Sequence, residues 1–224
     1  MKKIKLIALC LVTTSAFAQK ANQGNFTSEI GVSLASSGTT INSFGLNGRY
    51  FLLSRLALVG GVSGAYNKST DDFMQNTDGT GTKGSFTNVS HNFEVALGVQ
   101  KHFKGTNRIS PFVGADLFNN FTGAKKTGNN ANSLRFMDDY TYSEESKSQR
   151  IGLRAAIGFD YWIAQGLYFG VIYQPISVSL TTEQDTKLTT VQQGVSKTTI
   201  TPGSKSLNLN TTGRIGSIRL GWLF

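Results

Sequence analysis

Apolar and polar residues alternate along most of this chain, in separate segments of about ten residues each. Successive side chains of a β-strand point to opposite faces, so a period of two predicts strands with one apolar face. No stretch after residue 18 sustains the i, i+3, i+4, i+7 apolar spacing of an amphipathic helix. The predicted strands are 26–35, 43–52, 56–66, 89–101, 109–119, 151–161, 167–180 and 214–224.

The two faces of these strands differ in composition, and this difference indicates a membrane protein. One face carries Leu, Val, Ile and Phe, while the other carries Gly, Ala, Ser and Asn with few charges. Small residues suit the narrow interior of an eight-stranded barrel, which leaves the apolar face to contact lipid. The predicted fold class is therefore all-β, an eight-stranded antiparallel transmembrane β-barrel. In 167–180 the apolar parity changes at Gln174-Pro175, which predicts a β-bulge.

The connecting segments support the same fold. Those after the second, fourth and sixth strands are short, at 53–55, 102–108 and 162–166. Those after the first, third, fifth and seventh are 35–42, 67–88, 120–150 and 181–213, and the last three are long and polar. Short turns on one side and long loops on the other are typical of outer-membrane barrels, with the turns in the periplasm. Within the last loop, 186–200 alternates weakly and predicts a projecting hairpin.

The first eighteen residues have the pattern of a secretory signal peptide. Lys2, Lys3 and Lys5 form a basic start, 6–12 is a short apolar core, and Ala16-x-Ala18 is a small-residue cleavage site. The apolar run is too short for a spanning helix. The domains are thus a signal peptide over 1–18 and a barrel over 19–224.

Composition excludes several functional classes. The single cysteine, Cys10, lies in the signal segment, so no disulfide framework or cysteine zinc site is expected. The formal charge is +9, and the three lysines of the signal segment leave +6 for the rest. These basic residues are scattered rather than gathered in a stripe, which argues against nucleic acid as a partner. We expect no metal site and no cofactor.

Charged residues on the predicted inner face are the main candidate site. Charges enclosed in a narrow barrel require partners, and arginine holds carboxylates well. Two interpretations stay open: an ionic plug that fills the lumen, which we favour, or a selective path with the charges as gates. The predicted lumen charge network is Glu29, Arg49, Glu94, Asp116, Arg154, Asp160 and Arg219.

An enzymatic site is not expected, because the two histidines fall at opposite ends of one strand. His91 has the lipid-facing parity near the outer edge, and His102 lies on the short turn. A hydrolase site needs a histidine beside a serine or an acid. Only the outer loop acids Asp71, Asp72 or Asp78 are within reach of His91 in the sequence pattern, and a solvated histidine is the simpler interpretation.

The chain ends in Ser217-Ile-Arg-Leu-Gly-Trp-Leu-Phe224 and resembles the small outer-membrane β-barrel family of OmpX/OmpW-like proteins. Segments 49–58 and 110–114 are similar to that family's second hairpin and the start of its fifth strand. The resemblance implies a C-terminal signal for the barrel-assembly machinery, formed by Ile218, Leu220, Trp222 and Phe224. It also implies structural, adhesive, defensive or channel roles, among which the fold does not choose.

The sequence therefore predicts a non-enzymatic integral outer-membrane protein with a structural or surface-interaction role. The alternatives are a narrow porin-like channel for small molecules and a soluble periplasmic lipocalin-like barrel. Expected partners are outer-membrane lipid and lipopolysaccharide, whose phosphates suit basic residues of 120–150, together with the assembly machinery. The aromatic run 136–142 is a candidate anchor for a surface ligand.

Overall fold

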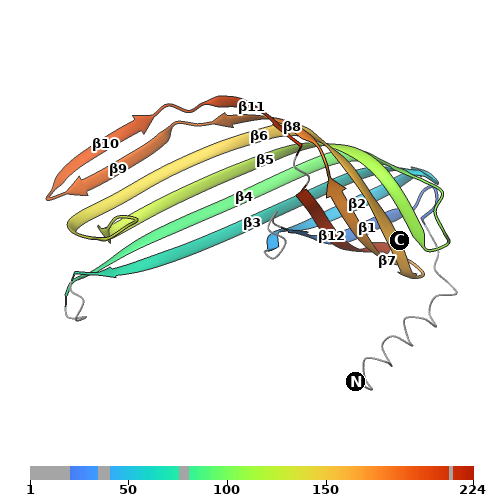
Figure 1. Ribbon diagram of the computed structural model, residues 1–224, viewed down its shortest axis with the longest axis horizontal. Coiled ribbons are helices and arrows are strands. Elements are labelled where there is room, and N and C mark those ends of the chain that lie inside the picture. Colours follow the sequence, from blue (N-terminus) through green and yellow to red (C-terminus); the bar gives the residue numbers. More distant parts are fainter. Residues whose placement is uncertain (1–20, 35–40, 76–80, 212–213) are drawn as a thin grey trace, which may run out of the picture.

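The computed structural model describes residues 21–34, 41–75, 81–211 and 214–224, and the predicted signal segment 1–18 lies outside these ranges. The described part is an all-β antiparallel sheet (Figure 1). No helix in the described ranges is long and apolar enough to cross a membrane. The strands are β1 (Phe26–Leu34), β2 (Ile41–Leu53), β3 (Leu56–Met74), β4 (Lys83–His102), β5 (Ile109–Ala131), β6 (Phe136–Ala164), β7 (Leu167–Gln174), β8 (Ser177–Glu183), β9 (Thr186–Gln192), β10 (Val195–Thr201), β11 (Lys205–Asn210) and β12 (Arg214–Leu223).

Eight of these strands close into a ring. β1 to β7 pair in sequence order, β7 pairs with β12, and β12 pairs with β1. The closure is reinforced at the chain end, where Phe224 N donates to the Phe26 carbonyl at 2.8 Å. The turns at 54–55, 103–108 and 165–166 all lie at one end of the ring, called here the short-turn end.

The ring places its apolar face outward and its polar and small residues inward. Leu97 on β4 is 64% exposed and Leu153 on β6 is 60% exposed, whereas Glu29 and Arg49 are fully buried. A small core lies inside the short-turn end and consists of Ala21, Phe51, Ala57, Trp162 and Tyr168. The predicted orientation of the two faces is thus confirmed, with the apolar side chains on the outer surface.

The predicted bulge at Gln174-Pro175 is also confirmed. The pairing of β6 moves from Ile157↔Tyr173 with β7 to Arg154↔Ser177 with β8, so three steps on β6 match four on the other strand. Proline has no N–H to give to the ladder, so the regular pairing stops there. This break is one reason why the structure has twelve strands while the predicted number is eight.

The prediction that 67–88, 120–150 and 181–213 are long loops is wrong for the described residues of these segments, most of which lie in strands. β3 and β4 continue beyond the ring as far as the pair formed by Met74 and Lys83, and β5 and β6 continue to a turn at 132–135. The aromatic run 136–142 is part of β6, where Tyr142 packs on Phe86 with ring centroids 5.6 Å apart. The predicted hairpin at 186–200 is confirmed as β9 and β10, and β9 pairs with β6 (Figure 1).

Candidate functional site: a buried ring of ions

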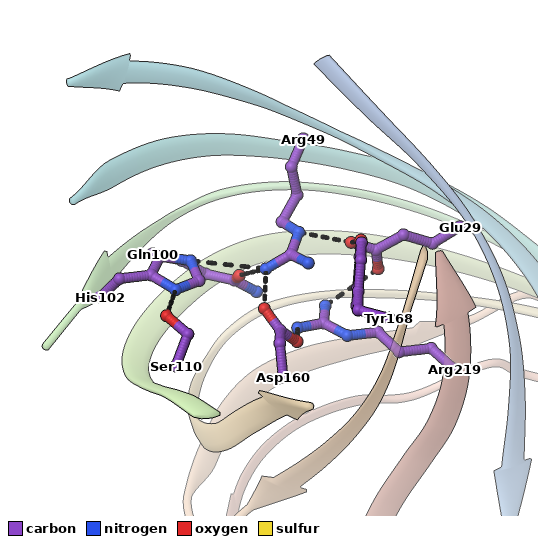
Figure 2. A network of polar contacts seen from close by, with 8 residues as sticks. All are labelled: Glu29, Arg49, Gln100, His102, Ser110, Asp160, Tyr168 and Arg219. Carbon is purple, nitrogen blue, oxygen red and sulfur yellow. Dashed lines mark hydrogen bonds and ion pairs between the residues drawn. The ribbon is translucent and has the colours of Figure 1, made fainter. Parts of the chain in front are cut away.

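Four of the predicted inner charges meet inside the short-turn end of the strand ring, one each from β1, β2, β6 and β12 (Figure 2). Arg49 pairs with Glu29, and its Nη1 lies 2.8 Å from Asp160 Oδ2. Arg219 completes the circuit, with Nη1 2.9 Å from Glu29 Oε2 and Nη2 2.8 Å from Asp160 Oδ1. Acids and arginines therefore alternate in a closed, electrically neutral group, named here the ion ring.

The ion ring is cut off from solvent. Glu29 and Arg49 are 0% exposed, Asp160 is 1% and Arg219 is 2%. Removing charges from water is costly, and only short pairs with further hydrogen bonds offset that cost. Here each carboxylate contacts two guanidinium groups. Arginine suits such buried pairs better than lysine, because its planar guanidinium group has several N–H donors in a fixed geometry.

Aromatic and polar neighbours complete the ion ring. The Tyr168 hydroxyl donates to Glu29 Oε1 at 2.5 Å, and the Arg49 guanidinium lies 4.9 Å from the centroid of the Tyr168 ring. Arg49 Nη1 also donates to Gln100 Oε1 at 3.3 Å. The sequence prediction considered charged residues alone and missed Gln100 and Tyr168, although their inward parity on β4 and β7 could have indicated them.

Two interior glycines make room for this group. A Cβ on Gly170 would stand 2.6 Å from Arg219 Nε and 2.8 Å from Asp160 Oδ1. A Cβ on Gly221 would overlap the Tyr168 ring. The glycine-rich inner face predicted from the sequence is therefore the space into which the long arginine and tyrosine side chains extend.

The other three predicted charges form a second cluster, farther from the short-turn end. Arg154 Nη1 lies 2.7 Å from Glu94 Oε1, and Arg154 Nε lies 2.5 Å from Asp116 Oδ1. These side chains are 14–19% exposed, so water reaches them. The Arg154 guanidinium also lies over the Phe118 ring at 4.8 Å. All seven predicted inner charges thus have ionic partners, in two groups.

Three of the cavities formed by the described residues lie along the interior, at successive distances from the short-turn end. A cavity of about 560 Å³ is lined by Arg150 and Arg154, and one of about 120 Å³ lies between Arg154 and Arg219. A third, of about 170 Å³, opens at the short-turn end beside His102 and Asp160. The two clusters therefore separate the interior into compartments.

His102 does not lie on the turn, where the sequence analysis placed it. It is the last residue of β4, is 4% exposed, and lies between the rings of Phe51 and Phe112 at 5.3 and 5.4 Å. One ring nitrogen is 3.0 Å from Ser110 Oγ, and the other is 3.4 Å from Arg49 Nη1. Because its second nitrogen faces a guanidinium and not a carboxylate, this pair lacks the acid that orients a catalytic histidine.

His91 lies on the outer face, exposed, as the sequence pattern predicts. Its ring packs over Gly123, where an added Cβ would stand 2.6 Å from the imidazole. Within the described ranges, no three His, Cys, Asp or Glu side chains are grouped so as to hold a metal ion.

A match to a protein-family model shows which family the chain belongs to. The model described as "Putative OmpA-OmpF-like porin family" matches residues 32–201, which is well over half of the chain. The chain belongs to this family. The match begins in β1 and ends at β10, so it includes the long extensions as well as most of the ring. No curated protein sequence matches the chain significantly.

Solved structures that are similar to this chain include three outer-membrane proteins. A major outer membrane protein from Thermus thermophilus has 13% identity and a TM-score of 0.48, with 89% of this chain and 99% of that chain covered. The N-terminal β-barrel domain of Pseudomonas aeruginosa OprF has 14% identity and a TM-score of 0.36, with 91% of this chain and 100% of that chain covered. OprG from the same organism has 12% identity and a TM-score of 0.41, covering 93% and 99%.

Proposed function

We propose that this member of the OmpA-OmpF-like porin family is an integral outer-membrane β-barrel, exported by the signal peptide over 1–18. The closed strand ring supports this proposal because its described residues leave no unpaired strand edge for lipid to meet. The apolar outer surface supports it too, since Phe44, Leu97 and Leu153 are each at least 60% exposed. A soluble lipocalin-like barrel would bury such side chains. The short turns then face the periplasm.

The role we propose is non-enzymatic and structural or surface-interacting, with a closed lumen. The observation that carries it is the ion ring, which crosses the interior with all four charges at most 2% exposed. An eight-stranded barrel has an interior just wide enough for side chains to fill. The OmpX/OmpW-like subfamily is part of this proposal, supported by the alternate apolar residues that end at Phe224.

Conductance of the refolded chain 19–224 in a planar bilayer tests the closed lumen. We expect no discrete current steps, because four mutually paired buried charges block the path at the short-turn end. A heat-dependent shift of the same sample on a gel shows that the barrel has folded. Steady currents from a sample that shows the heat shift would contradict the plug.

A narrow channel for small molecules is the second candidate, and the cavities on both sides of the ion ring favour it. The ion ring would then have to rearrange to join the cavities that already exist on either side of it. Discrete steps whose ion selectivity changes in Arg154→Ala would support this channel, since Arg154 lines two of the cavities. Steps unaffected by that substitution would place the conducting path elsewhere.

Deletion of Phe224 is expected to impair assembly into the outer membrane. Its backbone closes the ring against Phe26, and the residue is 75% exposed, so a receptor can reach it. The measurement is the amount of heat-modifiable protein in the outer-membrane fraction. The control is Leu134→Ala, a substitution of an exposed apolar residue at the turn between β5 and β6, far from the chain end. Equal assembly of both variants would show that the C-terminal residue is not the signal.

A further inference from the structure

Beyond the strand ring, β3, β4, β5, β6, β9 and β10 continue as one antiparallel sheet (Figure 1). Their registers are unbroken from the ring into this extension for β3 with β4 and for β4 with β5. Side chains that share a face with the exposed Val95 and Leu97 can therefore be followed outward, two residues at a time. This continuous outer face is arranged in rows of paired residues.

Four lysines lie in two neighbouring rows of the outer face. The first row beyond the aromatic residues Phe93 and Phe121 pairs Tyr66, His91, Gly123 and Lys147. The next row pairs Lys68, Val89, Lys125, Glu145, Lys187 and Ile200. The four lysines are exposed, and Glu145 is the single acid among the residues of these two rows.

The charges of these rows act on one another. Lys147 Nζ lies 2.8 Å from Glu145 Oε1. Hydrogen bonding and the positive charge of Lys147, with weaker effects of Lys125 and Lys187, lower the pKa of the Glu145 carboxyl. A single carboxylate is thus the negative charge that acts on three lysines, which leaves an excess of positive charge on this face. On the opposite face Lys126 has its own partner, Glu144, at 3.0 Å.

A row of hydroxyl groups follows directly beyond the lysines. Thr70 and Thr87 are hydrogen-bonded through their hydroxyls at 3.1 Å, and Thr189 and Thr198 at 3.3 Å. Hydroxyl side chains can both donate and accept, so they suit a ligand rich in hydroxyls. The complete row across the six strands is Thr70, Thr87, Thr127, Ser143, Thr189 and Thr198.

The order along the outer face is therefore apolar, aromatic, cationic and then hydroxylated. We propose that this face binds the phosphorylated glycolipid of the outer leaflet, lipopolysaccharide, a partner that rests on the outer-membrane location proposed above. The lysines contact its phosphates, and the hydroxyl row contacts the sugars beyond them. The side chains point sideways from the wall, toward neighbouring lipid. An anionic phospholipid offers the phosphate but has no saccharide to match the hydroxyl row.

The test measures binding of fluorescent lipopolysaccharide to the refolded chain 19–224 in neutral detergent. The double variant Lys125→Glu/Lys187→Glu is expected to bind at least roughly tenfold more weakly, because each reversal replaces an attraction to phosphate with a repulsion. Lys126→Glu on the opposite face is the matched control and is expected to bind like the unchanged chain. Equal binding by the double variant and the unchanged chain would overturn the proposal.

A second variant separates sugar contacts from phosphate contacts. Thr127→Val/Thr189→Val keeps the β-branched shape but removes two hydroxyls. We expect weaker binding of lipopolysaccharide and unchanged binding of phosphatidylglycerol. If the unchanged chain binds the two lipids equally at equal charge, the surface is not specific for the glycolipid and the proposal fails.

The heat-dependent gel shift keeps this test separate from the proposed function. Each variant is compared only after it shows the shift, and Lys125→Gln/Lys187→Gln replaces the charge reversal if that variant does not fold. A folded chain that reaches the outer membrane without binding lipopolysaccharide overturns the lipid site alone. A chain that never forms a heat-modifiable barrel overturns the proposed function as well.

Discussion

Val95→Arg is expected to lower the free energy of unfolding by about 2–4 kcal/mol, the cost of an arginine on the lipid face near the bilayer midplane. Val95 lies on β4 and is 37% exposed on the outer face, so an arginine has room there without a steric clash. In a water-soluble protein an exposed valine is replaced by arginine at little cost. The expected loss therefore arises from lipid and not from packing.

The same substitution at Val195 is the matched control. Val195 is 71% exposed on β10, in the sheet that projects beyond the ring, so Val195→Arg is expected to change the free energy by less than about 0.5 kcal/mol. Urea unfolding of both variants in lipid vesicles, followed by tryptophan fluorescence, gives the comparison. Similar small effects at both positions would show that the outer face of β4 does not contact lipid.

The sequence predicts the ring well because its outer surface and its narrow interior carry different kinds of residues at neighbouring positions. In β4, the apolar residues Phe93, Val95 and Leu97 face outward, while Glu94 and Ala96 face inward. A strict period of two follows directly from this contrast. The inward positions of all seven charged residues could be predicted for the same reason, since side-chain parity fixes the face of each.

The extensions could not be predicted, because the two faces there do not differ in the same way. On β5, for example, Thr127 on the outer face and its neighbour Lys126 on the opposite face are both polar. The alternation of apolar and polar residues therefore disappears although the strands continue. The individual ion pairs could not be predicted from the sequence either, since the partners come from strands that are distant along the chain. Asp160 and Arg219 meet only because β6 and β12 both pair with β7.

Arg49→Ala is expected to destabilise the protein by about 3–5 kcal/mol, the cost of breaking a buried ion pair by removing one partner. The variant leaves Glu29 and Asp160 with Arg219 as their shared cation, so the buried group carries an uncompensated negative charge. Lys126→Ala is the control, because the Lys126–Glu144 pair is exposed to water and is expected to contribute at most about 1 kcal/mol.

The double variant Glu29→Gln/Arg49→Ala separates loss of charge balance from loss of packing. It leaves Asp160 and Arg219 as a neutral pair, so we expect it to be more stable than Arg49→Ala although it carries one more substitution. Unfolding in urea is measured for the unchanged chain, the two single variants and the double variant, and the coupling energy between the two sites follows from the cycle.

The result also decides between the two proposed functions. A large cost for Arg49→Ala requires that the four charges are kept away from water, which is the condition for a plugged lumen. If Arg49→Ala costs no more than Lys126→Ala, then water reaches the ion ring and replaces the lost partner. A hydrated ion ring is the interior of a channel, and the conductance experiment on the unchanged chain should then show discrete steps.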